Sequence, residues 1–155
     1  MKAKNKIITA ILLSAGATVG TALINKYIKM SAISRNLLAQ PEPRCCRWRL
    51  GNIYYTKNGT GKPLLLVHDL THASSSCEWD SLIPLLKEHY TVYTIDLLGC
   101  GRSEKPNLTY TNFLYVQLLN DFVKSEIGRR TNILATGASA PIVTMACGYN
   151  PDLFE

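Results

Sequence analysis

The chain lacks any arrangement of cysteines that would hold a fold together. Its five cysteines are an odd number and contain no C-x-x-C pair, which argues against a disulfide framework and against a zinc site. The first 50 residues are poor in acidic side chains: nine Lys or Arg stand against one acid, Glu42, a balance of +8. Residues 51–155 carry eight basic and ten acidic side chains, a balance of −2. The positive charge therefore belongs to the N-terminal segment, which disfavours a nucleic-acid-binding face on the folded part and favours a membrane surface as partner.

Length and composition limit the chain to one folded domain. Of its 155 residues, 46% are apolar and 18% are charged, which is typical of a chain that folds. The segment Gln40-Pro41-Glu42-Pro43 breaks any helix before it, because proline fixes the backbone and lacks an N–H donor. We therefore expect a basic flank and helix over 1–30, a linker over 31–44 and a folded domain over 45–155.

An uncharged run of eighteen residues, Ile7 to Ile24, lies between lysines on both sides. Eighteen residues are at the short end of what spans a bilayer, and Gly16 and Gly20 make the run only moderately apolar. We expect a transmembrane signal-anchor helix and a single-pass membrane location. A cleaved signal peptide, which would leave a secreted protein, and a buried or interfacial helix are the alternatives. The lysines are nearly balanced on the two flanks, so the positive-inside rule leaves the orientation open.

From Cys45 onward the pattern is that of strands and helices in alternation. Residues on both sides of Gly51-Asn52 alternate in polarity, which predicts a hairpin there. Three apolar segments then alternate with two segments of helical spacing, in the order 64–67, 79–86, 91–95, 115–122 and 132–135. This alternation predicts the α/β class, with parallel strands joined by crossover helices.

Polar loops follow the three apolar strands, over 68–76, 96–103 and 136–141. Since the carboxyl ends of parallel strands meet at one edge of a sheet, we expect these loops to lie together. Ligands in such folds bind at this edge. The sequence therefore predicts a functional site formed by the three loops.

The third loop has the layout of a nucleophile elbow, a strand followed by a sharp turn with a central serine and then a helix. Small neighbours, Gly137 and Ala138, suit a tight turn. We expect the hydroxyl of Ser139 to project clear of the backbone, with the N–H of Ala140 beside it to stabilise a developing oxyanion. A plain strand–helix turn is the alternative, because a Gly-x-Ser-x-small pattern by itself is weak.

Two other kinds of site fit the loops poorly. A dinucleotide loop at Gly99-x-Gly101 lacks its third glycine, since Glu104 stands in that place. His68, Asp69 and His72 could be drawn as metal ligands, but no further cluster accompanies them, and a polar loop is the simpler interpretation. We expect neither a cofactor nor a metal.

The motifs together resemble the α/β-hydrolase family. Leu64–Asp69 is similar to the family's strand ending in His-Gly, Asp96–Ser103 is similar to its D-x-x-G-x-G-x-S turn, and Gly137–Pro141 is similar to its elbow. Trp79 also stands where the family often has a tryptophan. The resemblance runs from about residue 45 to the end. It implies an incomplete α/β-hydrolase sheet, an N-terminal hairpin plus three parallel strands with crossover helices, preceded by the membrane helix.

The resemblance also implies roles for single residues. Ser139 would be the catalytic nucleophile, and the N–H groups of Leu70 and Ala140 would form the oxyanion hole. The structural turn residues would be Gly99, Gly101 and Gly137. The substrate would be a small acyl or lipid-like compound.

Two residues depart from the family's pattern inside the loops. Asp69 replaces the usual glycine after the histidine, and its carboxylate would oppose a nearby oxyanion. Pro141 replaces the last glycine of the elbow; proline is acceptable in a first helical turn, but its ring would crowd the contact between strand and helix.

The third departure concerns the catalytic triad, whose order in this fold is Ser, acid, His. No histidine follows His89, and the only acids after Ser139 are Asp152 and Glu155, which lie too close to the elbow along the chain. We therefore expect the N-terminal part of an α/β hydrolase, from a truncated or decayed gene. The strand over 132–136 would then be an exposed apolar edge through which the protein associates with itself.

Two functions follow from these observations. The first is a membrane-anchored serine hydrolase of the esterase, lipase or thioesterase kind, inactive or feeble as this chain because the triad acid and histidine are missing. The alternative is a non-catalytic binding or scaffold protein with the same fold, or the product of a truncated gene.

Overall fold

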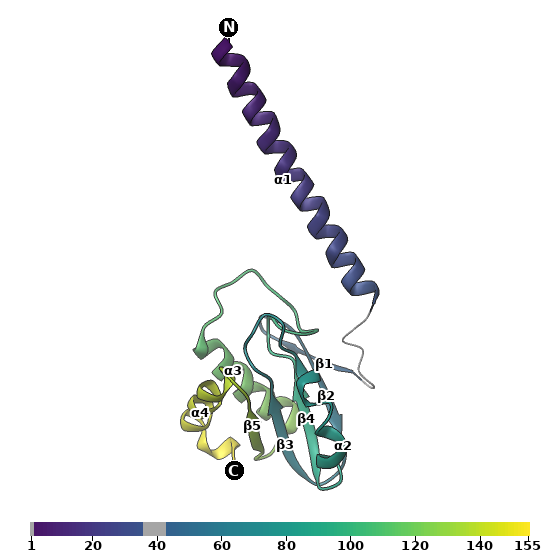
Figure 1. Cartoon of the computed structure of the whole chain (residues 1–155). Helices are drawn as coiled ribbons and strands as arrows, with labels where there is room; N and C mark the ends of the chain where they lie inside the picture. Colours follow the sequence, from purple (N-terminus) through teal and green to yellow (C-terminus); the bar gives the residue numbers. More distant parts are fainter. Residues whose placement is uncertain (1, 36–42) are drawn as a thin grey trace. The chain divides into compact units, whose positions relative to one another are not determined.

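The computed structural model of the protein describes residues 2–35 and 43–155 (Figure 1). The chain divides into two compact units, Met1–Ala39 and Gln40–Glu155. Of the predicted linker, 31–44, residues 36–42 lie outside the described residues, and residues 31–34 are helical.

The first unit consists of one long helix, α1 (Lys2–Ser34). It contains the whole uncharged run and extends past it at both ends. Hydroxyl side chains within the helix donate to carbonyls of its preceding turn, as Ser14 does to Ile11 O at 2.9 Å and Thr21 to Ala17 O at 2.8 Å. These bonds give the hydroxyl groups of Ser14 and Thr21 a partner within the helix itself.

Among the described residues, no helix is sufficiently long and apolar to cross a membrane. The predicted transmembrane helix over 1–30 is therefore not supported.

The second unit is built on a five-stranded sheet. Its strands are β1 (Arg44–Trp48), β2 (Gly51–Asn58), β3 (Lys62–Val67), β4 (Tyr90–Ile95) and β5 (Asn132–Ala135). They lie in the order β1-β2-β4-β3-β5. The pairs β1–β2 and β2–β4 are antiparallel, whereas β3 pairs in parallel with both β4 and β5. The predicted hairpin followed by three parallel strands is thus confirmed.

The turn of the hairpin lies two residues before its predicted place. Trp48 pairs with Gly51, so Arg49 and Leu50 form the turn and Asn52 belongs to the strand. Glu104 explains the shift: its carboxylate accepts from the N–H of Asn52 at 2.9 Å, and its own N–H donates to the carbonyl of Asn52 at 2.9 Å. Both backbone groups of Asn52 are therefore bonded to a distant segment, which holds the residue extended.

Helices connect the parallel strands. They are the short η1 (Ser76–Trp79) and α2 (Ile83–Leu86) after β3, α3 (Asn112–Phe122) with η2 (Val123–Ile127) after β4, and α4 (Ser139–Tyr149) with η3 (Pro151–Leu153) after β5. Thr111 caps α3 by accepting from the N–H of Leu114. Gly128, at φ 71°, ends the helical segment as predicted.

The core lies on both faces of the sheet, because β3 is apolar and buried from its second residue onward. Leu65 and Val67 pack with side chains from α3 and α4, whereas Leu64 and Leu66 pack with Trp79 on the opposite face. Figure 1 shows α2 on one side of the sheet and α3 and α4 on the other. This two-sided burial is what a continuous apolar run predicts for a central parallel strand.

Strand β5 closes one end of the sheet and pairs with β3 alone. The side chain of Leu134 is 45% exposed. The last residues of the chain cover only the beginning of this edge, through a bridge between Thr131 and Phe154. As predicted, the strand before the elbow is an apolar edge.

Candidate active site

The three polar loops over 68–76, 96–103 and 136–141 meet at the carboxyl ends of β3, β4 and β5; we call this the three-loop edge. The fully buried ring of His68 joins the first loop to the second. Its Nε2 accepts from the N–H of Leu97 at 3.0 Å, which leaves Nδ1 to donate to the carbonyl of Asp69 at 2.6 Å. The ring is therefore a neutral structural link, with both nitrogens engaged.

The carboxylate of Asp96, 3% exposed, is a second link between these loops. One oxygen accepts from the N–H of Ser76 at 2.7 Å and the other from the N–H of Arg102 at 2.8 Å. Gly99 and Gly101 have positive φ, 89° and 47°. A Cβ on Gly101 would overlap the carboxylate of Asp96, so only glycine lets the turn close around this buried charge.

The carboxylate of Asp69 joins the first loop to the third. Its Oδ1 accepts from the N–H of Leu70 at 2.7 Å and from the N–H of Ala138 at 2.7 Å. Glu78 supports the same junction, because its Oε2 accepts from the N–H of Asp69 at 3.1 Å and from the hydroxyl of Thr136 at 3.3 Å. Two acidic side chains therefore hold the first loop against the end of β5.

Gly137 forms the tip of the turn between β5 and α4. Its φ is 55°, whereas Ala138 already has helical angles of −70° and −12°. A Cβ on Gly137 would overlap the carboxylate of Asp69. In a nucleophile elbow the strained tip of the turn carries the nucleophile itself. Here that position has no side chain, and Asp69 occupies the space in front of it.

Ser139 lies two residues beyond the tip, as the first residue of α4. It is 0% exposed, and its hydroxyl donates to the carbonyl of Thr136 at 2.8 Å. The expectation that the turn would project this hydroxyl clear of the backbone is therefore wrong. The tip of the turn is Gly137, so residue 139 is already in the first turn of α4, where its side chain is buried.

Ala140 also differs from its expected place in the site. Its N–H donates to the carbonyl of Gly137 at 3.2 Å and closes the first turn of the helix. The donor that converges with Leu70 is the N–H of Ala138. A residue after the tip of the elbow and a residue after β3 are the two that form an oxyanion hole in this fold. The sequence analysis named Leu70 and Ala140 as the two donors, whereas the structure brings the N–H of Leu70 together with that of Ala138.

Cys100 is the one cysteine in the loops over 68–76, 96–103 and 136–141, and it is buried. Burial raises the pKa of this thiol, and its Sγ lies 3.9 Å from the carbonyl of Thr71, to which it donates. A buried, protonated thiol is a poor nucleophile. Cys100 therefore does not replace the serine.

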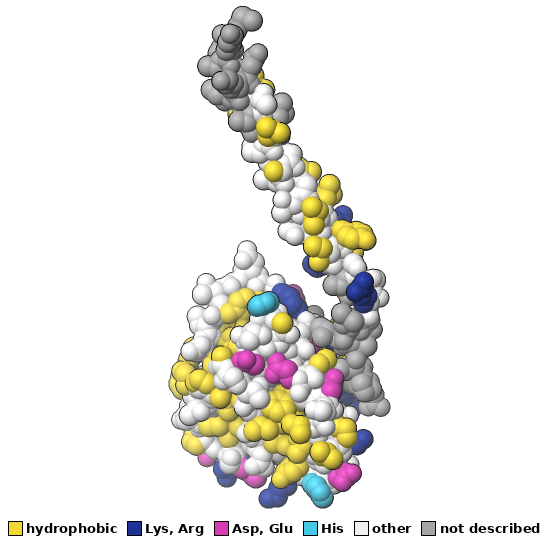
Figure 2. Space-filling model, in the orientation of Figure 1, with side chains coloured by type: hydrophobic (Ala, Val, Ile, Leu, Met, Phe, Trp, Pro, Cys, Tyr) yellow, Lys and Arg dark blue, Asp and Glu magenta, His cyan; other side chains and the backbone are white. Residues whose placement is uncertain are grey.

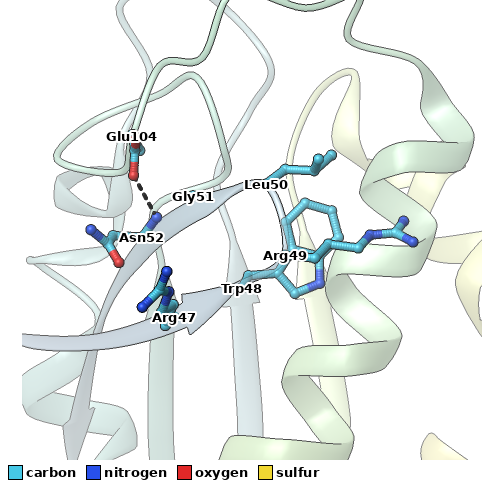
Figure 3. Close-up of a pocket in the computed structure, with 7 residues that line it drawn as sticks. All are labelled: Arg47, Trp48, Arg49, Leu50, Gly51, Asn52 and Glu104. Carbon is cyan, nitrogen blue, oxygen red and sulfur yellow. Dashed lines mark hydrogen bonds between the residues drawn. The ribbon is translucent and has the colours of Figure 1, made fainter.

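No group of three or more His, Cys, Asp or Glu side chains suited to a metal ion occurs in the described ranges 2–35 and 43–155. A surface hollow lies instead at the hairpin turn, lined by residues 47–52 and Glu104 (Figure 3). It contains no hydroxyl, thiol or imidazole, and its carboxylate is bonded to the N–H of Asn52. Arg49 lies over the ring of Trp48, 4.9 Å from its centroid. This hollow has no groups for hydrolysis.

The register of the elbow is the feature that sequence reasoning misread. Residues at 135, 137 and 139 are all small, so the pattern small-x-tip-x-small can be centred on Gly137 as well as on Ser139. The presence of a hydroxyl favoured the second choice. The positive φ of Gly137 and the close contact of Asp69 with it show that the turn is centred on Gly137. Both features depend on contacts between segments that are distant in the sequence.

Comparison with known proteins agrees with the fold. The α/β hydrolase family matches residues 64–149, more than half of the chain. A 2-hydroxy-6-oxo-6-(2'-aminophenyl)hexa-2,4-dienoic acid hydrolase from Metapseudomonas resinovorans is 38% identical over 72 residues, which are 46% of this chain and 25% of that protein. A soluble epoxide hydrolase from Corynebacterium sp. (strain C12) is 44% identical over 54 residues, 35% of this chain and 18% of the relative.

Similarity to solved structures extends over nearly three quarters of the chain. A serine hydrolase involved in carbazole degradation superposes with a TM-score of 0.70 at 25% identity, over 74% of this chain and 45% of that one. An α/β hydrolase fold protein from Burkholderia ambifaria gives 0.66 at 24% identity, over 72% and 40%, and bears on the fold alone. The chain thus covers less than half the length of these relatives. On the family match and the shared sheet, the chain belongs to the α/β-hydrolase family.

Proposed function

We propose that this chain is a non-catalytic, or at most feeble, member of the α/β-hydrolase family that serves as a binding or scaffold protein. The observation that carries the proposal is the contact of Asp69 with Leu70 and Ala138. The two N–H groups that would stabilise an oxyanion already bind a carboxylate of the chain itself. A substrate carbonyl would have to displace a covalently attached anion.

The surroundings of Ser139 support the same proposal. A serine becomes nucleophilic when a base takes its proton and the oxygen faces the substrate. The hydroxyl of Ser139 donates to a backbone carbonyl, which is no base, and the residue is fully buried. Neither condition is met around this residue.

The second candidate is serine hydrolysis through Ser139, acting on a small acyl or lipid-like substrate. It is favoured by the family and by relatives whose names describe hydrolases of a dienoic acid and of epoxides. It would require Asp69 to leave the Ala138 N–H and Ser139 to leave the first turn of α4. The contacts at the three-loop edge therefore favour the non-catalytic function.

We further propose that α1 brings the protein to a membrane surface. Apolar side chains such as Leu23, Ile24 and Ile28 are each about 60% exposed in this helix, and Lys26 and Lys29 lie among them. Exposed apolar side chains give the helix surface to bury in a bilayer, and the lysines beside them attract anionic lipid headgroups.

Vesicle flotation tests the membrane proposal. The full chain is expected to float with vesicles that contain anionic lipid, and a Leu23→Glu, Ile24→Glu variant is expected to remain largely in the dense fractions. A full chain that stays in the dense fractions with anionic vesicles would contradict the proposal.

We also propose that two copies of the chain associate through β5. The strand has a free edge without charged or proline residues, which favours pairing with another strand. Figure 2 shows apolar side chains near the side on which α4 lies, where Met145 is 47% and Tyr149 is 67% exposed. A second copy of the chain would cover both features.

Sedimentation velocity tests this association. We expect the wild-type chain to form dimers or larger species as its concentration rises, and Leu134→Lys to shift it toward monomer. The matched control is Leu85→Lys, because Leu85 is also exposed but lies in α2. Equal sedimentation of wild type and both variants as monomers would rule out pairing at β5.

Labelling with a fluorophosphonate probe tests the absence of catalysis. The purified chain is expected to take up no more probe than Ser139→Ala does, with an active serine hydrolase as positive control. In a working triad, replacing the serine lowers kcat on the order of 10⁶-fold, so even a feeble enzyme would differ clearly from its alanine variant. Stoichiometric labelling that Ser139→Ala abolishes would refute the proposed function.

The contact between Asp69 and Gly137 predicts an unequal cost of two alanine substitutions. Gly137 and Gly128 both have left-handed φ, 55° and 71°, so each alanine pays about 1–2 kcal/mol of backbone strain. Nothing lies within 4 Å of a Cβ on Gly128, whereas a Cβ on Gly137 overlaps the Asp69 carboxylate. Gly137→Ala is therefore expected to lower the free energy of unfolding by roughly 1–3 kcal/mol more than Gly128→Ala.

Urea unfolding of the two variants, and of both in an Asp69→Gly background, measures this difference. The excess cost of Gly137→Ala should disappear in that background, because the overlapping carboxylate is gone. An excess that persists without Asp69 would show that the strain has another source.

A further inference from the structure

Two N–H donors at the three-loop edge converge on one point because the sheet fixes their spacing. In the parallel pair β3–β5, Val67 lies opposite Ala135. Leu70 and Ala138 each follow three residues later, and their N–H groups meet at Asp69 Oδ1 at 2.7 Å each. The donors belong to separate segments, so their convergence depends on the pairing of β3 with β5 together with the two loops that follow these strands.

The point of convergence also favours negative charge. Ala138 is the N-cap residue of α4, an eleven-residue helix with no acidic residue in its first turn. The amino end of a helix attracts an anion through its free N–H groups and its dipole. Asp69, in the loop that follows β3, supplies the negative charge that the first turn of α4 lacks.

We propose that Asp69 is a built-in ligand: its carboxylate closes an anion site made by the N–H groups of Leu70 and Ala138, and replacing it with glycine opens that site to a small monocarboxylate. The inference deepens the proposed function and rests on it, since a working hydrolase would need these donors free during turnover. In the native chain the protein fills this anion site with its own carboxylate.

Size and charge identify the class of ligand. The carboxylate lies against Gly137 closely enough that a single added Cβ would overlap it, so a formate- or acetate-sized anion matches the group that Asp69 would vacate. The carboxylate of Glu78 is nearby and is held by the N–H of Asp69 and the hydroxyl of Thr136. A monoanion would restore the native charge beside Glu78, whereas a phosphate dianion would add to it.

Acetate titration of the full-length Asp69→Gly variant tests the proposal, with sodium chloride holding the ionic strength constant. The variant is expected to unfold at a lower temperature than wild type, and acetate is expected to raise its Tm in a saturable way. Wild type should not respond, because its site is filled. Asp80→Gly is the matched control, since Asp80 is exposed and lies outside the site.

The amide resonances of the two donors give a second readout. In Asp69→Gly, the N–H signals of Leu70 and Ala138 should shift together as acetate is added. In Asp69→Asn, which keeps a side-chain carbonyl as acceptor, they should not shift. If Asp69→Gly is unfolded without acetate, far-UV circular dichroism replaces the melt, and acetate-dependent refolding is then the expected result.

The outcomes separate this inference from the proposed function. Acetate that leaves the Tm, the two amide signals and any unfolded population of Asp69→Gly unchanged would overturn the built-in ligand, even where no serine is labelled. An equal response of wild type or Asp80→Gly would overturn it as well. Labelling of Ser139 by fluorophosphonate would refute the proposed function and leave a saturable acetate response as an observation about the anion site.

Discussion

The junction of Asp69 with Leu70 and Ala138 is the interaction on which the character of this protein depends. One oxygen of this carboxylate accepts hydrogen bonds from two backbone N–H groups, each at 2.7 Å. One donor follows β3 and the other follows β5, its parallel neighbour in the sheet. Hydrogen bonds to a charged acceptor are about twice as strong as those between neutral groups. The geometry that would stabilise an oxyanion therefore stabilises the fold. While the two N–H groups are bonded to Asp69, they are not available to a substrate oxyanion.

The remaining contacts of the three-loop edge strengthen this closed arrangement. His68 and Asp96 bind backbone N–H groups of the neighbouring loops from buried positions, and Glu78 binds both Asp69 and Thr136. In a hydrolase of this fold, polar side chains at the edge must leave a nucleophile exposed. Here His68, Asp96, Asp69 and Glu78 tie loops together, and the serine of the elbow region is enclosed by the first turn of α4.

The similarity to hydrolases and the closed site are compatible, because different residues determine the fold and the activity. The family match and the shared sheet report the scaffold, which is decided by the apolar strands and their crossovers. Activity is decided by a few atoms at the strand ends. In the function that we propose, a glycine at the tip of the turn and an aspartate opposite it stand in place of a nucleophile, while the strands of the sheet are retained.

The sequence by itself determined the architecture. The four-residue apolar run Leu64–Val67 could only be a strand buried on both faces, and the alternation after it required parallel strands with their loops at one edge. What only the tertiary structure decided was the register within that edge. Small residues at 135, 137 and 139 give equivalent local patterns, so the choice of Gly137 as the tip depended on Asp69, nearly 70 positions earlier, fitting against it. Local propensity fixes elements because it acts between neighbours; the site is fixed by contacts between residues that are neighbours only after folding.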